Sequence, residues 1–174
     1  MSIDLERLGR RVGEALRSRG AVLATVESCT GGWVAEVVTA VPGSSAWFDR
    51  GYVTYSNQAK IDLVGVSALT LERHGAVSEP VVREMACGAL ARSPATVAVA
   101  ISGVAGPGGG TPEKPVGMVC LAWAREVRDC TAERSALRVD SLTVHLPGDR
   151  AAVRQAAVII VLEGVCERLV AGAP

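Results

Sequence analysis

Three side chains that can act as nucleophiles, Ser28, Cys29 and Thr30, stand side by side and are followed by Gly31 and Gly32. Glycines let ligand atoms approach the backbone closely, and the helix expected after them offers free N–H groups and a positive dipole end. Such a turn suits a nucleophile with an oxyanion or anion site beside it. The same residues also suit a purely structural tight turn, and taken alone they leave both interpretations open.

A serine nucleophile needs a group that takes its proton, and histidine is scarce in this chain. The two histidines, His74 and His145, lie far in sequence from the glycine-rich turns, so a Ser-His-Asp triad would have to recruit one over a long range. With so few histidines and no Cys-x-x-Cys pair, we find no convincing transition-metal set. We therefore expect neither a metal nor a cofactor.

The two lysines, Lys60 and Lys114, stand out in a chain that has sixteen arginines. A desolvated lysine can lose its proton whereas arginine cannot, so Lys60 is the candidate base for Ser28. An ordinary lysine has a pKa near ~10.4, so this role requires burial or a neighbouring positive charge to lower the pKa. Tyr55 could link Ser28 and Lys60 through its hydroxyl or orient the amine. In the plainer interpretation, Lys60 is a solvated helix residue and Tyr55 a half-buried strand aromatic.

Cys29 is the competing nucleophile. A thiol at a helix start would have a lowered pKa and be reactive, but a catalytic cysteine normally works with a nearby histidine. We therefore favour Ser28, and note that a Cys29 hydrolase would be inactivated by thiol reagents. The cysteines of the chain are five in number and widely spaced. This pattern predicts free thiols in a reducing cytoplasm, not a disulfide framework or a zinc site.

A second glycine-rich turn runs from Ser102 to Gly110, after an expected buried strand. It lacks the Gly-Lys-Ser/Thr of a Walker P-loop, yet its N–H groups could hold a phosphate or carboxylate at the carboxyl edge of a sheet. Arg150 and Arg154 lie at the start of the last expected helix. Their guanidinium groups could bind phosphate or pair with acidic side chains.

The elements that must position these groups alternate between helices and strands. Helices are expected over residues 4–19, 30–41, 57–63, 67–74, 78–93 and 150–170, and strands over residues 21–25, 48–55, 96–101 and 116–124. Residues 125–129 should form a turn, and residues 131–146 should hold one or two further strands, with 141–146 the clearer part. This order predicts a single domain over residues 1–174, with a three-layer α/β fold and a mixed sheet.

The overall composition excludes several classes of protein. Eighteen basic and eighteen acidic side chains give a net charge of zero, which gives no support for nucleic-acid or membrane-surface binding. Forty-nine per cent hydrophobic residues and a mean hydropathy of +0.30 predict a well-buried core. No apolar run approaches the ~18 residues of a membrane span, and the first residues lack the apolar core of a signal peptide. We expect a cytoplasmic protein.

Taken together, the motifs resemble those of the CinA carboxy-terminal domain family, in the same order and over nearly the whole chain. The matching stretches are Glu-Ser-Cys-Thr-Gly-Gly from residue 27, Pro-Gly-Ser-Ser-Ala-Trp-Phe from residue 42, Tyr-Val-Thr-Tyr-Ser-Asn from residue 52 with Lys60, Gly-Ala-Val-Ser from residue 75, Ile-Ser-Gly-Val-Ala-Gly-Pro from residue 101, Lys-Pro-Val-Gly from residue 114 and Gly-Asp-Arg from residue 148.

The resemblance implies a single-domain α/β/α sandwich and a metal-independent serine amidase, with Ser28 as nucleophile assisted by Lys60 and Tyr55. It also implies the substrate, nicotinamide mononucleotide (NMN), whose carboxamide would be hydrolysed to nicotinate mononucleotide and ammonia in pyridine-nucleotide salvage. We expect a homo-oligomer, most simply a dimer. The residues expected to bind substrate are Thr30, Gly31, Gly32, Ser45, Ser102, Gly103, Gly106 and Arg150.

In the expected mechanism, neutral Lys60 takes the proton of Ser28, which attacks the carboxamide carbon. Backbone N–H groups at residues 30–32, or in the second glycine-rich turn, stabilise the oxyanion. Ammonia leaves, and water resolves the acyl-enzyme. An alternative from another class is a non-catalytic nucleotide-binding or competence-associated accessory protein that keeps the pocket.

The chain departs from the family pattern in two respects. Longer members carry an additional amino-terminal molybdopterin-binding-like domain, whereas this chain begins with the amidase-like domain. Residues 125–146 are also longer than expected, so the strands in that segment and any interface they form stay open.

Overall fold

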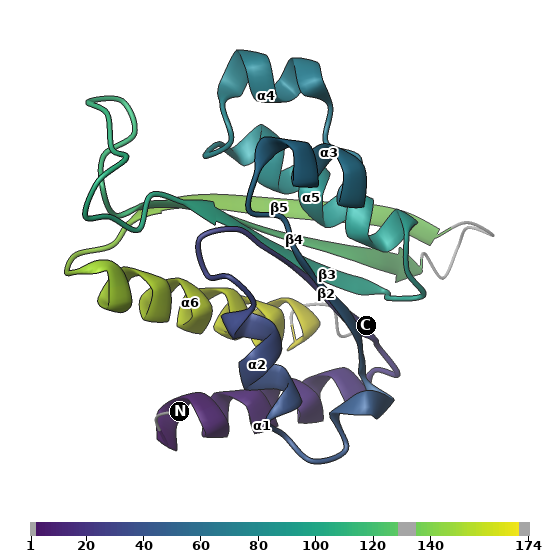
Figure 1. Ribbon diagram of the computed structural model, residues 1–174. Coiled ribbons are helices and arrows are strands. Elements are labelled where there is room, and N and C mark those ends of the chain that lie inside the picture. Colours follow the sequence, from purple (N-terminus) through teal and green to yellow (C-terminus); the bar gives the residue numbers. More distant parts are fainter. Residues whose placement is uncertain (1–2, 129–134, 171–174) are drawn as a thin grey trace.

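A single five-stranded sheet organises the computed structural model, which describes residues 3–128 and 135–170 (Figure 1). The strands lie in the order β2-β1-β3-β4-β5, where β1 is parallel to β2 and β3, and β4 is antiparallel to β3 and β5. Their bounds are β1 Leu23–Glu27, β2 Phe48–Val53, β3 Val97–Gly103, β4 Met118–Arg128 and β5 Ser135–His145. The sheet is therefore mixed, as expected from the sequence.

Helices cover both faces of this sheet (Figure 1). On one face lie α1 (Ile3–Ser18), α2 (Trp33–Thr39) and α6 (Arg150–Val170). On the other lie α3 (Asn57–Val64), α4 (Ala68–His74) and α5 (Glu79–Ala91). The prediction of a three-layer α/β/α sandwich is confirmed.

The alternation of side chains along the strands divides the core into two layers. In β3, Val97, Val99 and Ile101 pack toward α1, α2 and α6, whereas Ala98 and Ala100 pack toward α5. Successive strand residues point to opposite faces, so a strand covered on both sides reads as one continuous apolar run. The alanines on the α5 side leave room for that helix to lie close to the sheet.

The prediction of a turn at residues 125–129 is wrong for residues 125–128, the part that the structure describes. Residues 125–128 continue β4 and pair with β5, where Arg125 stands opposite Arg138. Cross-strand pairing in a long hairpin overrides the weak strand preference of charged residues. One strand, β5, occupies the described part of residues 131–146, and residues 129–134 lie outside the described chain.

Two boundaries beside the turn at residues 28–32, called the serine turn below, also differ from the prediction. Strand β1 runs on to Glu27, and α2 begins only at Trp33 because Gly31 and Gly32 adopt φ of 63° and 98°, outside the helical range. By contrast, α3 begins and ends where expected. The hydroxyl of Ser56 accepts the N–H of Ala59 at its start, and Gly65 ends it in a left-handed conformation.

Among the described helices, none combines the length and the apolarity that crossing a membrane requires.

Candidate active site

The carboxyl ends of the three parallel strands meet at one edge of the sheet, where α/β proteins commonly bind ligands. Ser28 follows β1, Thr54 follows β2, and Ser102 is the second-last residue of β3. After β2 the chain forms α3, which brings Lys60 back to this edge. The strand order thus places side chains from separate parts of the sequence beside Ser28.

Lys60 lies directly against the serine hydroxyl. Its Nζ is 3.2 Å from Ser28 Oγ and 2.8 Å from the carbonyl oxygen of Thr54, and the residue is 1% exposed. Burial lowers the pKa of Lys60, because the charged amine loses its hydration, and among the described ion pairs none involves this amine. A neutral amine can donate to Thr54 and keep its lone pair for the Ser28 proton.

The adjacent thiol has the opposite character. Cys29 is buried, and desolvation raises its pKa to about 11, so the thiol stays protonated at neutral pH. This favours Ser28 over Cys29 as the nucleophile. The other described cysteines, Cys87, Cys120 and Cys166, are also free thiols, and no cluster of metal-ligating side chains occurs within the described ranges.

The start of α2 is occupied by a carboxylate of the protein itself. Glu27 is 1% exposed and accepts the N–H groups of Gly32, Val34 and Ala35 at 3.0, 3.0 and 2.9 Å. A buried carboxylate is stabilised by such N–H groups and by the helix dipole. The sequence-based expectation of free N–H groups at this helix start is therefore wrong.

The expected oxyanion donors at residues 30–32 are accordingly reduced in number. Gly32 donates to Glu27, and Gly31 donates to the carbonyl oxygen of Ser28 at 3.1 Å. No acceptor for the Thr30 amide is found in the described chain. The hydroxyls of Thr30 and Thr54 are buried without a hydrogen-bond partner among the described residues, so polar groups beside Ser28 are left unsatisfied.

Tyr55 does not join the serine to the lysine in this structure. Its side chain is 62% exposed, and its hydroxyl accepts a hydrogen bond from Arg150 at 3.2 Å. Arg150 also donates to the carbonyl oxygen of Gly106 at 2.8 Å. The expected link between Ser28 and Lys60 is thus replaced by a link between Tyr55 and α6, and any role in catalysis stays a prediction.

Arg154, one turn further along α6, holds the serine turn. Its Nε donates to the carbonyl oxygen of Cys29 at 3.1 Å, and its Nη2 donates to that of Thr30 at 2.9 Å. The guanidinium lies 5.3 Å from the centre of the Trp33 ring. Neither Arg150 nor Arg154 takes part in the described ion pairs, so pairing with acids is not what these arginines do.

Two cavities open beside these arginines. One, of about 630 Å³, is lined by residues of the second glycine-rich turn and the start of α6, including Gly106, Arg150 and Arg154. The other, of about 330 Å³, is lined by Thr30, Gly31, Gly32, Trp33, Glu36 and Arg154. Their volumes fall in the range of small-molecule sites.

In the second glycine-rich turn, two of the expected ligand-binding residues make structural contacts. Ser102 is buried and its hydroxyl donates to the carbonyl oxygen of Ala76 at 2.8 Å. A Cβ on Gly103 would lie 2.8 Å from Val119, so glycine lets β4 approach β3 closely. Only Gly106, of the three expected here, lines a described cavity.

Ser45 lies away from this edge, contrary to expectation. It belongs to a short 3-10 turn, Ser44–Ala46, just before β2, and the first residue of β2, Phe48, pairs with Leu23 at the start of β1. Parallel pairing therefore places Ser45 at the amino ends of the strands, whereas Ser28 lies beyond the carboxyl end. The second lysine, Lys114, donates instead to the carbonyl oxygen of His74 at the end of α4.

Fold and site together define an α/β/α sandwich protein with a buried lysine against a serine at the carboxyl edge of its sheet. The chain belongs to the CinA C-terminal domain family, whose sequence pattern matches residues 5–169.

The relatives of this chain carry two kinds of name. It is 52% identical over 160 residues to the nicotinamide-nucleotide amidohydrolase PncC of Escherichia coli K12, covering 92% of each chain. It is 50% identical to a protein of the same name from Pseudomonas putida, covering 92% of this chain and 94% of that one. A crystal structure of a competence-damaged protein (CinA) superfamily protein from Klebsiella pneumoniae matches with a TM-score of 0.86 at 38% identity, covering 96% and 98% of the two chains.

Proposed function

We propose that this protein is an amidohydrolase that converts NMN and water to nicotinate mononucleotide and ammonia. The observation that carries the proposal is the 3.2 Å contact between Lys60 Nζ and Ser28 Oγ, made by a lysine whose pKa is lowered by burial. The names of the relatives, which match over nearly the full length of both chains, support the same reaction and substrate.

In the acylation step, neutral Lys60 takes the proton of Ser28 as Oγ bonds to the carboxamide carbon. The carbonyl π electrons move to oxygen, and the Thr30 N–H is the backbone donor beside the nucleophile that we assign to this oxyanion. Collapse of the intermediate breaks the C–N bond while protonated Lys60 passes its proton to the leaving nitrogen. The products of this step are ammonia and an ester on Ser28.

Deacylation repeats the sequence with water. Lys60, neutral again, takes a proton from the attacking water, and the second tetrahedral intermediate expels Ser28, which recovers its proton from Lys60. The carboxylate of nicotinate mononucleotide is released. One water is consumed for each ammonia formed, and no oxidant, metal or cofactor enters the balance.

The cavities support a small anionic substrate. The larger one is lined by Arg150, at the start of α6, and by residues of the second glycine-rich turn. An anion such as a phosphate is favoured by a guanidinium and by a helix N-terminus. We assign substrate binding to Thr30, Gly106 and Arg150, and the contributions of Gly31, Gly32, Ser102 and Gly103 to backbone shape.

We take residues 1–174 as one amidohydrolase domain, which the family match over residues 5–169 supports. The cytoplasmic location and the homodimer stay predictions from the sequence.

A second candidate is a nucleotide-binding accessory protein without turnover. The name of the Klebsiella structure, which refers to competence and not to an enzyme, favours keeping it. Both candidates predict NMN binding, but only the first predicts products.

The test incubates purified protein with NMN and measures ammonia and nicotinate mononucleotide by chromatography. We expect the two products in equal amounts, and no product with Lys60→Arg, because arginine keeps the charge and cannot act as a base. Binding of NMN without product would favour the accessory protein. Unchanged turnover in Lys60→Arg would make Lys60 an anchor and not a base.

A further inference from the structure

Arg154 is the one side chain of α6 that contacts the backbone of the serine turn through two adjacent carbonyl groups, those of Cys29 and Thr30. Arginine presents its N–H groups in a rigid planar fork, so two contacts to neighbouring carbonyls fix the orientation of both peptide planes. The indole of Trp33 limits the movement of the guanidinium from one side. The contact therefore restrains the turn that carries Ser28 from outside the turn itself.

The orientation of a carbonyl sets the orientation of the next amide. The Cys29–Thr30 peptide bond is trans, so the Cys29 carbonyl and the Thr30 N–H point in opposite directions. Because Arg154 holds the carbonyl, the Thr30 N–H is directed away from Arg154. Among the amides of residues 30–32, this is the one for which the described chain offers no acceptor, whereas the Gly31 and Gly32 amides are already bonded within the turn.

We propose that Arg154 is a positioning residue, which fixes the Ser28 turn and aims the Thr30 N–H at the developing oxyanion through the carbonyls of Cys29 and Thr30. This inference rests on the proposed function, since it assigns the Thr30 amide to that reaction. Arg154 touches neither Ser28 Oγ nor Lys60 in the described contacts, and it acts through the peptide backbone.

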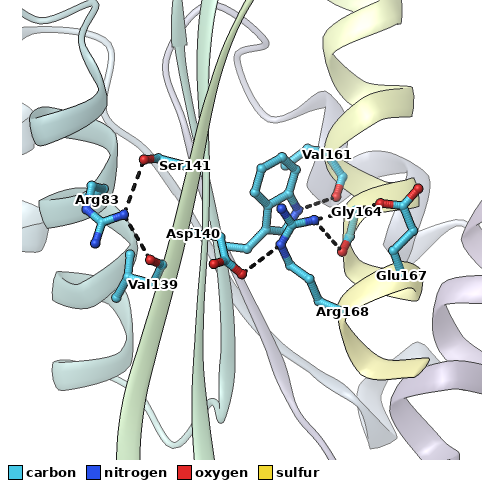
Figure 2. Close-up of polar contacts among 9 residues, drawn as sticks. Arg83, Val139, Asp140, Ser141, Val161, Gly164, Glu167 and Arg168 are labelled. Carbon is cyan, nitrogen blue, oxygen red and sulfur yellow. Dashed lines mark hydrogen bonds and ion pairs between the residues drawn. The ribbon is translucent and has the colours of Figure 1, made fainter. Parts of the chain in front are cut away.

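A matched control lies on the same helix. Arg168 also stacks on an indole, 3.8 Å from the centre of the Trp123 ring, and donates to a backbone carbonyl, that of Gly164, at 3.2 Å. Figure 2 shows its guanidinium between the side chain of Asp140 and the carbonyl oxygen of Gly164, and the contact with Asp140 is 3.1 Å long. It lies fourteen residues, or about 21 Å of helix, from Arg154. Substitution of Arg168 removes similar interactions without touching the serine turn.

The kinetic experiment compares wild type, Arg154→Gln, Arg154→Lys and Arg168→Gln with NMN as substrate. Arg154→Gln should lower kcat by about a hundredfold with KM changed less than about threefold, because the defect lies in the alignment of reacting groups. Arg154→Lys can reach only one carbonyl and should fall in between. Arg168→Gln should leave kcat within about twofold of wild type and lower the Tm. A raised KM with unchanged kcat in Arg154→Gln would make Arg154 a substrate ligand and overturn the proposal.

Hydrogen exchange supplies a readout that does not depend on turnover. In Arg154→Gln, the amides of residues 28–33 should exchange faster than in wild type, with those of β4 unchanged, whereas Arg168→Gln should leave residues 28–33 as they are. Unchanged exchange in Arg154→Gln would overturn the positioning role. If wild type fails to hydrolyse NMN while Arg154→Gln still loosens the turn, the proposed function fails but the restraint by Arg154 stands.

Discussion

At the scale of single residues, the environment of Lys60 decides whether a serine can be activated without histidine. The amine is buried beside Ser28 and its described contacts include no carboxylate. Burial lowers its pKa, so the neutral form is easier to reach than in an exposed lysine. An ion-paired lysine would keep its proton and could not act as a base. Activation of Ser28 therefore depends on the absence of a carboxylate among the described contacts of Lys60 as well as on the distance between the two residues.

This environment predicts a pH dependence of kcat. Lys60 must be neutral, so kcat should rise with pH as the amine loses its proton, and the midpoint of the rise should lie below 10.5, the ordinary lysine value, because burial lowers the pKa. A pH profile of kcat with NMN measures this midpoint. A profile that is flat, or that falls over the range in which lysine loses its proton, would contradict the role of Lys60 as base.

Residue-level reasoning from sequence found the serine and the lysine but misplaced other residues. Ser28 and Lys60 could be paired from the sequence, because the scarcity of histidine and lysine left few candidate bases. The positions of Tyr55 and Ser45 could not be predicted, because they depend on side-chain direction and strand register. The two hydrogen bonds of Arg154 depend on α6 lying against the serine turn, a tertiary arrangement with no local sequence signal beyond an arginine near a helix start.

At the scale of elements, Glu27 connects the end of β1 to the start of α2. Its carboxylate accepts three backbone N–H groups, so the turn between them is closed by the protein and not by a ligand. The sequence shows an acidic residue before the turn, but β1 had been expected to end at Thr25, which left Glu27 outside any element. Because the end of β1 was placed too early, the role of Glu27 as the acceptor for the N–H groups at the start of α2 was not predicted.

Replacing Glu27 should therefore cost stability. Glu27→Gln keeps the shape but places an NH2 group against a backbone N–H, and we expect the free energy of unfolding to fall by about 2 kcal/mol. Urea unfolding measures the change. Glu36→Gln, an exposed residue of the same helix, should stay within about 0.5 kcal/mol of wild type. Equal effects of the two substitutions would show that the cap contributes little.

The position of α3, and with it Lys60, depends on contact with α5. A Cβ on Gly88 of α5 would lie 1.7 Å from the carbonyl oxygen of Val64, one turn after Lys60. Helix propensity alone would favour alanine by about 1 kcal/mol, but the clash must push the helices apart.

Gly88→Ala should accordingly lower both the free energy of unfolding, by about 1–3 kcal/mol, and kcat, because α3 carries Lys60 away from Ser28. Calorimetry and NMN turnover check the two effects. Gly108→Ala is the control for stability, since a Cβ there meets nothing within 4 Å. A more stable Gly88→Ala protein would mean that the helices adjust without cost.

At the scale of the whole molecule, the order of the sheet brings the site together. Ser28 follows β1, Lys60 lies on α3 and Arg154 lies on α6; these residues are distant in sequence but meet at one edge of the sheet. The alternation of helices and strands predicted the layers correctly, since buried apolar runs and amphipathic helices follow from composition and periodicity. The extent of β4 and β5 was missed, because charged residues in a long hairpin resemble a turn.

A folded pocket should bind its substrate even when the nucleophile is removed. We expect NMN at about 100 times its Kd to stabilise the Ser28→Ala protein by about 2.7 kcal/mol, seen as a higher Tm in a thermal scan. Nicotinamide, which has the carboxamide but no phosphate, should give a smaller shift at the same concentration. Equal shifts would argue against an anion subsite at Arg150.

The most direct test of the Ser28 assignment compares two adjacent residues with NMN as substrate. Ser28→Ala should lower kcat by at least about a thousandfold, because the nucleophile and its base act as a unit. Cys29→Ala should keep kcat within a few-fold of wild type, because burial raises the pKa of that thiol to about 11. Near-normal turnover in Ser28→Ala together with loss of turnover in Cys29→Ala would contradict the account.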